Sequence, residues 1–138
     1  NFTSKLLLSE IQKINEVEVE PNIILLGDFN EDPDDKNVLL LESAGLTNLM
    51  TTMIDEEDIS TYIYRGTNYL YDQIIVSNSI LDKKGFTLVD STAYILDLPK
   101  YRQQKGKYKN YPFRFWAGNK LLGGYSDHLA VKVDFVIK

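Results

Sequence analysis

Four consecutive apolar residues, Ile23 to Leu26, set the strongest limit on how this chain folds. Side chains of a strand alternate between its two faces, so a strand that is apolar at every position is expected to be covered on both. Gly27 and the polar run DFNEDPDD follow at once. The pattern predicts a buried strand that ends in a polar loop, the place where α/β sheets usually bind their ligands.

The rest of the chain predicts a mixed α/β fold of the α+β kind. Apolar residues at helical spacing predict helices at 3–16 and 36–45. In the final run, alternation places Leu129, Val131 and Val133 on one face of a strand. The 138 residues contain no repeat or linker, so we expect one domain. Besides the strand at 22–27, strands are expected at 60–65, 71–77, 84–91, 113–117 and 129–138, with a turn around 66–68.

Charge is unevenly distributed along the chain. The net charge of −5 argues against a general nucleic-acid-binding surface. The interval 98–126 nevertheless holds seven lysines and arginines and no acidic residue, which predicts a local patch that attracts anions. Aromatic residues interleave these cations, as in surfaces that bind a nucleic-acid strand. A solvated loop whose later aromatics belong to the core would give the same pattern.

Composition excludes two further classes. There is no cysteine, so disulfides and thiolate metal sites are ruled out. No apolar run approaches the roughly 20 residues that a membrane span needs.

Three short motifs carry polar residues at strand ends. GDFN supplies Asp28 and Asn30, YDQI supplies Asp72, and SDH supplies Asp127 and the single histidine, His128. Each motif alone also has a purely structural interpretation, because Gly, Asp and Asn are common in turns and a lone histidine beside a strand can serve packing. Adjacent residues of an extended segment point to opposite sides, so His128 needs a partner other than Asp127. Asp72 is the candidate.

In this order and strand context, the three motifs resemble the signature of the endonuclease/exonuclease/phosphatase superfamily, whose members include DNase-I-like enzymes. The likeness covers nearly the whole chain and extends to bacterial nucleases. It implies half of a four-layer α/β sandwich, with one mixed, mostly antiparallel sheet and helices on one face. It also implies a metal-dependent phosphodiester hydrolase, with a nuclease as the leading hypothesis. The alternatives are a phosphatase or sphingomyelinase-like member, or a non-catalytic binding module that has lost its metal site.

The resemblance assigns a role to each motif residue. Asp28 would orient or deprotonate the attacking water, and Asn30 would hold the scissile phosphate. His128 would donate hydrogen bonds to that phosphate, with Asp72 fixing the imidazole. Asp127 would contact the metal, Mg²⁺ or alternatively Mn²⁺ or Ca²⁺. These residue types suit the reaction, because its transition state spreads negative charge that needs fixed donors and a cation.

Two arginines are expected to bind the substrate, which would be nucleic acid or another phosphodiester. Arg65 precedes the YDQI motif, and Arg114 belongs to the basic interval. For Arg65, a solvated turn residue is the alternative.

Part of the family's pattern has no counterpart here. The Gln-Glu motif that supplies a principal metal ligand is absent, and Glu10 lies on the first helix. We therefore expect residues 1–138 to be the C-terminal half of the family's domain, with little activity alone. A bare apolar sheet face, through Leu129, Val131 and Val133 or their opposite neighbours, would then self-associate or pair with an N-terminal half. Localisation stays open, since a signal for export would lie in that half.

Overall fold

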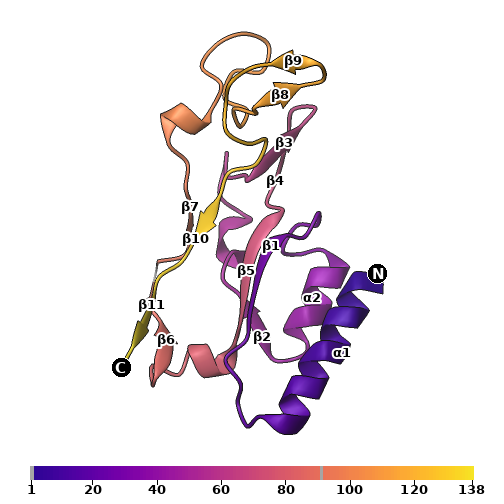
Figure 1. Cartoon of the computed structure of the whole chain (residues 1–138), viewed down its shortest axis with the longest axis vertical. Helices are drawn as coiled ribbons and strands as arrows, with labels where there is room; N and C mark the ends of the chain where they lie inside the picture. The colour runs from indigo at the N-terminus through magenta and orange to yellow at the C-terminus, as the bar shows by residue number, and fades with distance from the viewer. Residues whose placement is uncertain (1, 91) are drawn as a thin grey trace.

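The structure, a computed structural model, describes residues 2–90 and 92–138. Two helices and several short strands make up its regular elements (Figure 1). The helices are α1 (Phe2–Val17) and α2 (Lys36–Glu42). The strands are β1 (Ile24–Asp28), β2 (Leu46–Asn48), β3 (Tyr62–Tyr64), β4 (Thr67–Tyr69), β5 (Asp72–Ser77), β6 (Phe86–Leu88), β7 (Tyr94–Ile95), β8 (Trp116–Ala117), β9 (Lys120–Leu121), β10 (Val131–Lys132) and β11 (Phe135–Ile137).

The α+β class expected from the sequence is confirmed. Every strand pair in the described part of the chain is antiparallel. The strands are distributed over several small sheets in place of one: a three-stranded sheet in the order β1-β5-β2 and two-stranded sheets. Helices α1 and α2 cover one face of the three-stranded sheet, and β6, β7, β10 and β11 run along its other side (Figure 1).

Strand β5 separates two apolar clusters. Successive side chains of a strand point to opposite faces, and Ile75 packs with Ile11 and Leu41 of the helices. Its neighbours Ile74 and Val76 pack on the other side with residues that include Val131 of β10. The side chains of Ile74, Ile75 and Val76 are all fully buried. The strand that is covered on both faces is therefore β5.

The expectation that β1 is covered on both faces is wrong. Ile24 is 39% exposed and Leu26 is 64% exposed, while Leu25 between them packs against the helices. The reason is position, because β1 lies at the edge of its sheet and β5 occupies the middle. The strands that cross the other face contact β5 and leave the outer side of β1 open.

The C-terminal run also differs from its prediction. It divides into β10 and β11, which pair with different strands, β7 and β6. Leu129 is buried, and Val131 and Val133 pack against the cluster around Ile74. This face of the run is thus covered, whereas Val136 and Ile137 of β11 are among the exposed apolar residues.

Other boundaries shift for local reasons. The segment 60–71 forms a β3–β4 hairpin with Arg65 and Gly66 in its turn, so residues 67 and 68 belong to a strand and not to the expected turn. Of 113–117, only Trp116–Ala117 is a strand. Of 84–91, only Phe86–Leu88 is a strand, and residue 91 lies outside the described residues.

The packing of β5 predicts the effect of a core truncation. Ile75→Ala removes a fully buried side chain between the sheet and both helices, so it should lower the free energy of unfolding by about 2–5 kcal/mol. Urea denaturation followed by circular dichroism measures the change. Ile137→Ala is the matched control, because Ile137 is 81% exposed and should change stability little. Equal effects of the two substitutions would contradict this account of the core.

Candidate active site

The pairing of β1 with β5 brings two motif aspartates together. In this antiparallel register Asp28, the last residue of β1, lies opposite Asp72, the first residue of β5. Gly27 adopts φ +145°, a conformation that residues with a side chain rarely adopt, and Asn30 has φ +51°. This tight turn lets Oδ1 of Asp28 accept a hydrogen bond from the backbone N–H of Asn30 at 2.8 Å. GDFN is thus a turn and also places a carboxylate and an amide at an open strand end.

Thr61 fixes the third motif against the first two. Its Oγ1 accepts a hydrogen bond from the Asp72 N–H at 3.0 Å, and its carbonyl accepts one from the Leu129 N–H at 2.8 Å. The backbones of Tyr62 and His128 form an antiparallel bridge beside it. Because Thr61 is fully buried, these bonds are shielded from water. They hold His128 beside the first residue of β5.

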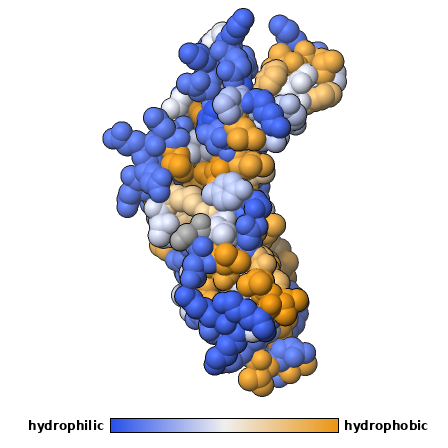
Figure 2. All heavy atoms as spheres, turned by 90° about the vertical axis from the view of Figure 1, so that its left-hand side faces the viewer, coloured by the Kyte–Doolittle hydropathy of each residue, from blue (hydrophilic) through white to orange (hydrophobic). Residues whose placement is uncertain are grey.

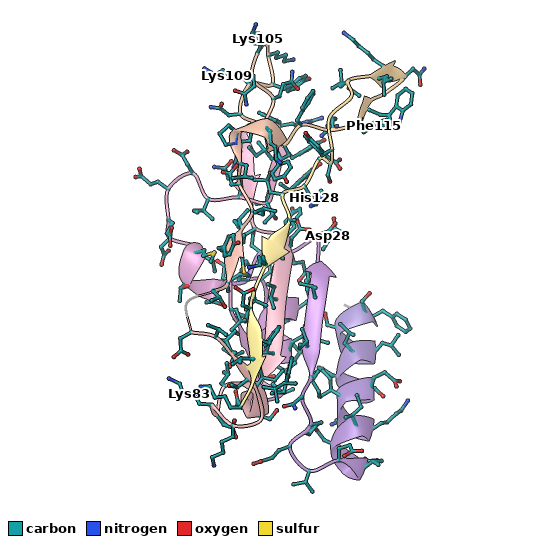
Figure 3. The ribbon with its side chains drawn as sticks, turned by 60° about the vertical axis from the view of Figure 1, so that its left-hand side comes forward. Asp28, Lys83, Lys105, Lys109, Phe115 and His128 are labelled. Carbon is teal, nitrogen blue, oxygen red and sulfur yellow. The ribbon has the colours of Figure 1, made fainter. Side chains whose placement is uncertain are left out.

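The His128 imidazole lies between Asp72 and Asp28, and Figure 3 shows His128 close to Asp28. Its Nδ1–H donates to Oδ2 of Asp72 at 2.7 Å, and its Nε2 lies 3.9 Å from Oδ2 of Asp28. The ring also stacks on Tyr62 with centroids 4.6 Å apart. Asp72 and Tyr62 thereby fix the ring orientation, with Nε2 on the side of the exposed Asp28. Such an imidazole can donate to, or exchange a proton with, a group that enters there.

Sequence reasoning gave Gln73 no role, yet it secures the loop that follows Asp28. This fully buried side chain donates from Nε2 to the carbonyls of Glu31 and Leu70, and its Oε1 accepts from Asn48 Nδ2 at 2.7 Å. The signal was present in the sequence, because Gln73 is a polar residue inside an apolar strand and such a residue needs buried partners.

Asp32 ties the same loop to the start of β5. Its Oδ1 accepts a hydrogen bond from the Leu70 N–H. Burial raises the pKa of the Asp32 carboxyl, and this hydrogen bond opposes the rise. With the bond from the Phe29 N–H to the Tyr71 carbonyl at 2.8 Å, the loop after Asp28 is held at several points.

The remaining predicted residues form a neighbouring group. Asp127 lies 3.8 Å from the guanidinium of Arg114 and so contacts a different partner from His128. Arg65 lies at the exposed turn of the β3–β4 hairpin, with its guanidinium 5.2 Å from the centre of the Tyr64 ring. Arg65 and Arg114 line one cavity. The structure therefore brings Asp28, Asn30, Asp72 and His128 together, whereas the two arginines line a separate cavity, from which Arg114 reaches Asp127, the neighbour of His128.

The basic interval is an ordered part of the fold. Phe113 donates its N–H to the Tyr101 carbonyl at 2.7 Å, and Tyr125 donates its N–H to the Phe113 carbonyl at 2.6 Å. At Gly124, an added Cβ would lie 2.1 Å from the Phe113 carbonyl oxygen, so only glycine permits this crossing of the two segments. The crossing holds Phe113 against the C-terminal end of the basic interval, close in sequence to His128.

The described residues do not fit a divalent metal ion on their own. Within 2–90 and 92–138, no three His, Asp or Glu side chains are placed to hold one ion. Mg²⁺ requires oxygen ligands in near-octahedral geometry, and Asp127, the expected contact, pairs with a guanidinium.

A half-buried histidine–aspartate pair thus lies beside an exposed carboxylate at one end of β1 and β5. The sequence profile of the Endonuclease/Exonuclease/phosphatase family matches residues 2–137, and the chain belongs to that family. Its members are generally hydrolases of phosphoesters and are typically metal-dependent. No curated protein and no solved structure gave a significant match. No helix among the described residues is long and apolar enough to span a membrane.

The buried amide of Gln73 predicts a stability effect with a simple control. Gln73→Leu leaves two carbonyls and the Asn48 amide without their partner, so it should cost about 2–4 kcal/mol of unfolding free energy. Gln104→Leu removes the same amide from an exposed position and should cost far less. Chemical denaturation of both variants measures the difference. A tolerated Gln73→Leu would show that this amide does not hold the loop.

Proposed function

We propose that this chain carries the phosphate-binding catalytic residues of a metal-dependent phosphodiesterase, most specifically a nuclease. The observation that supports the proposal is the position of His128 between Asp72 and Asp28 at the open end of β1 and β5. Three motifs distant in the sequence supply these groups. A purely structural histidine would not require a second carboxylate beside its free nitrogen.

Each residue has a definite part in the proposed reaction. Asp72 holds Nδ1, so Nε2 of His128 is directed at the substrate and can donate to a phosphate oxygen as negative charge develops. Asp28 orients the attacking water or takes its proton, and the Asn30 amide donates to the scissile phosphate. The 3.9 Å between Nε2 of His128 and Oδ2 of Asp28 exceeds a hydrogen bond, so these two groups do not occupy each other. Arg65 and Arg114 would contact its flanking phosphates.

Mg²⁺ is the proposed cofactor, and it would supply a further positive charge to the phosphate. Since the described residues do not complete its site, we propose that other ligands come from an N-terminal half of the family's domain. The exposed Ile24 and Leu26 of β1 are the apolar surface that such a half would cover. On this proposal, the chain alone hydrolyses phosphodiesters slowly.

The roles of His128 and Asp72 predict a loss of activity. We expect His128→Ala and Asp72→Asn each to lower hydrolysis of bis(p-nitrophenyl) phosphate and plasmid DNA by roughly 10²-fold or more. The assays contain Mg²⁺ and are run with and without the N-terminal half of a full-length family member. Asp90→Asn is the control, because Asp90 is an exposed carboxylate whose partner Lys83 lies at the far end of the molecule from His128 (Figure 3). Full activity of His128→Ala would reject the proposed mechanism.

The incomplete metal site predicts a weak response to Mg²⁺. A bound ion raises the melting temperature only when its concentration exceeds its dissociation constant, so millimolar Mg²⁺ should leave the chain alone unchanged. Adding the N-terminal half should produce a shift, and Leu26→Asp should prevent it by placing a charge on the covered face. Differential scanning fluorimetry and light scattering measure both effects. A saturable shift for the chain alone that disappears in Asp127→Asn would show that these residues suffice.

One observation favours a second candidate, hydrolysis of a lipid headgroup. The β8–β9 hairpin exposes Phe115, Trp116 and Leu121, which are each about half exposed, and apolar surface covers the lobe at the upper right of Figure 2. Exposed apolar patches of this kind mark surfaces that bind proteins or membranes. Release of phosphorylated headgroups from vesicles, with no cleavage of DNA, would favour this candidate.

A further inference from the structure

A cavity of about 770 Å³ is lined by Arg65 and Arg114, the two arginines expected to bind substrate. Residues of the β3–β4 hairpin and of the basic interval, including Ala117 and Gly118 of the β8–β9 hairpin, line it. Its volume falls within the range of pockets that hold small organic ligands. The side chains that give it chemical character are Tyr64, Arg65, Lys107, Tyr108, Tyr111 and Arg114.

The lining combines aromatic faces with cations. Lys107 lies 5.4 Å from the centre of the Tyr108 ring, and Tyr111 packs edge-on against that ring at 5.4 Å. Tyr108 is half exposed, so part of its ring is open to a ligand. None of the described residues that line the cavity is acidic. Planar, electron-rich groups stack on such rings, and anions pair with such cations.

Two contacts connect the cavity to the catalytic residues. Tyr62 stacks on His128 at 4.6 Å and on Tyr64 at 6.5 Å, with 11° between the two tyrosine rings. Arg114, on the cavity wall, lies 3.8 Å from Asp127, the neighbour of His128. The stacked rings of Tyr62 and Tyr64, together with the guanidinium of Arg114, therefore connect the surroundings of the His128 imidazole with the cavity.

The seven cations of the basic interval are not all available to a ligand. Arg102 forms a salt bridge with Asp97 at 2.7 Å, whereas Arg114, 3.8 Å from Asp127, still lines the cavity. Lys105 and Lys109 lie together at the upper end of the molecule in Figure 3, beyond His128. The positive charge is thus concentrated at the end of the molecule that holds the cavity. The sugar–phosphate backbone of a nucleic acid bound at the candidate catalytic residues would pass there.

We propose that this cavity binds an unpaired nucleotide of a single-stranded nucleic acid, next to the scissile phosphate. Base faces inside a duplex are covered by their neighbours, so a duplex offers no face to Tyr108 without unstacking, whereas a single strand does. The chain therefore binds single strands more tightly than duplexes of the same sequence. The position relative to the scissile phosphate rests on the proposed nuclease function, while the cavity itself is tested by binding alone.

The test is fluorescence anisotropy with a labelled single-stranded oligonucleotide of about 12 nucleotides, a length within the usual site sizes of single-strand binders. EDTA is present, so hydrolysis plays no part. Tyr108→Ala should raise the dissociation constant by about 5–150-fold, the equivalent of one lost stacking contact. The control is Tyr94→Ala. Tyr94 is also partly exposed, has Lys132 at the same 5.4 Å from its ring centre, and does not line the cavity.

The outcomes separate this inference from the proposed function. Tighter binding of the single strand than of the duplex, weakened by Tyr108→Ala and not by Tyr94→Ala, supports the cavity even if no hydrolysis occurs under any condition. Equal affinity for single strand and duplex, or equal effects of the two substitutions, overturns it even if the chain cleaves DNA. Binding to phosphatidylcholine vesicles with no affinity for the oligonucleotide also overturns it, in favour of the lipid candidate.

Discussion

The register between β1 and β5 is the constraint on which the rest of the structure depends. It places Asp28 opposite Asp72 at one end of the pair and, along the same strand, directs Ile75 to the helices and Ile74 to the second layer of strands. A slip by one residue would turn every side chain of β5 to the opposite face. Core and candidate site therefore share one alignment, and the burial of β5 protects the geometry of the two aspartates.

The candidate site divides its tasks between buried and exposed groups. Thr61 and Gln73 are fully buried and hold backbone segments in place. Asp72 is mostly covered and orients His128, whereas Asp28 and Asn30 remain open. Groups that need a fixed position are thus shielded from water, which strengthens their hydrogen bonds. Groups that would meet a substrate stay accessible at the strand end.

Much of this arrangement could be predicted from short motifs, because polar residues at strand ends are conspicuous against apolar runs. The partnership proposed for Asp72 and His128 followed from adjacency, which directs Asp127 and His128 to different sides. The exposure of Leu26 could not be predicted, since an apolar run does not reveal whether its strand is central or at an edge. The polar residue inside an apolar run indicated that Gln73 needs buried partners, but the sequence could not identify them, because Glu31 and Asn48 are distant along the chain.

Hydrogen bonds join the two ends of a loop within the basic interval, and this affects how the sequence of that loop can vary in evolution. Arg102 and Pro112 pair as an isolated bridge, and Gln103 and Asn110 bond across it, so residues 104–109 form an excursion whose ends already meet. The cost of lengthening a loop with fixed ends rises only slowly with its length. Insertions, deletions and exchanges there can reshape the rim around the cavity while the crossing at Gly124 preserves the alignment of His128. The rim of the cavity and the geometry around His128 can thus diverge independently within one chain.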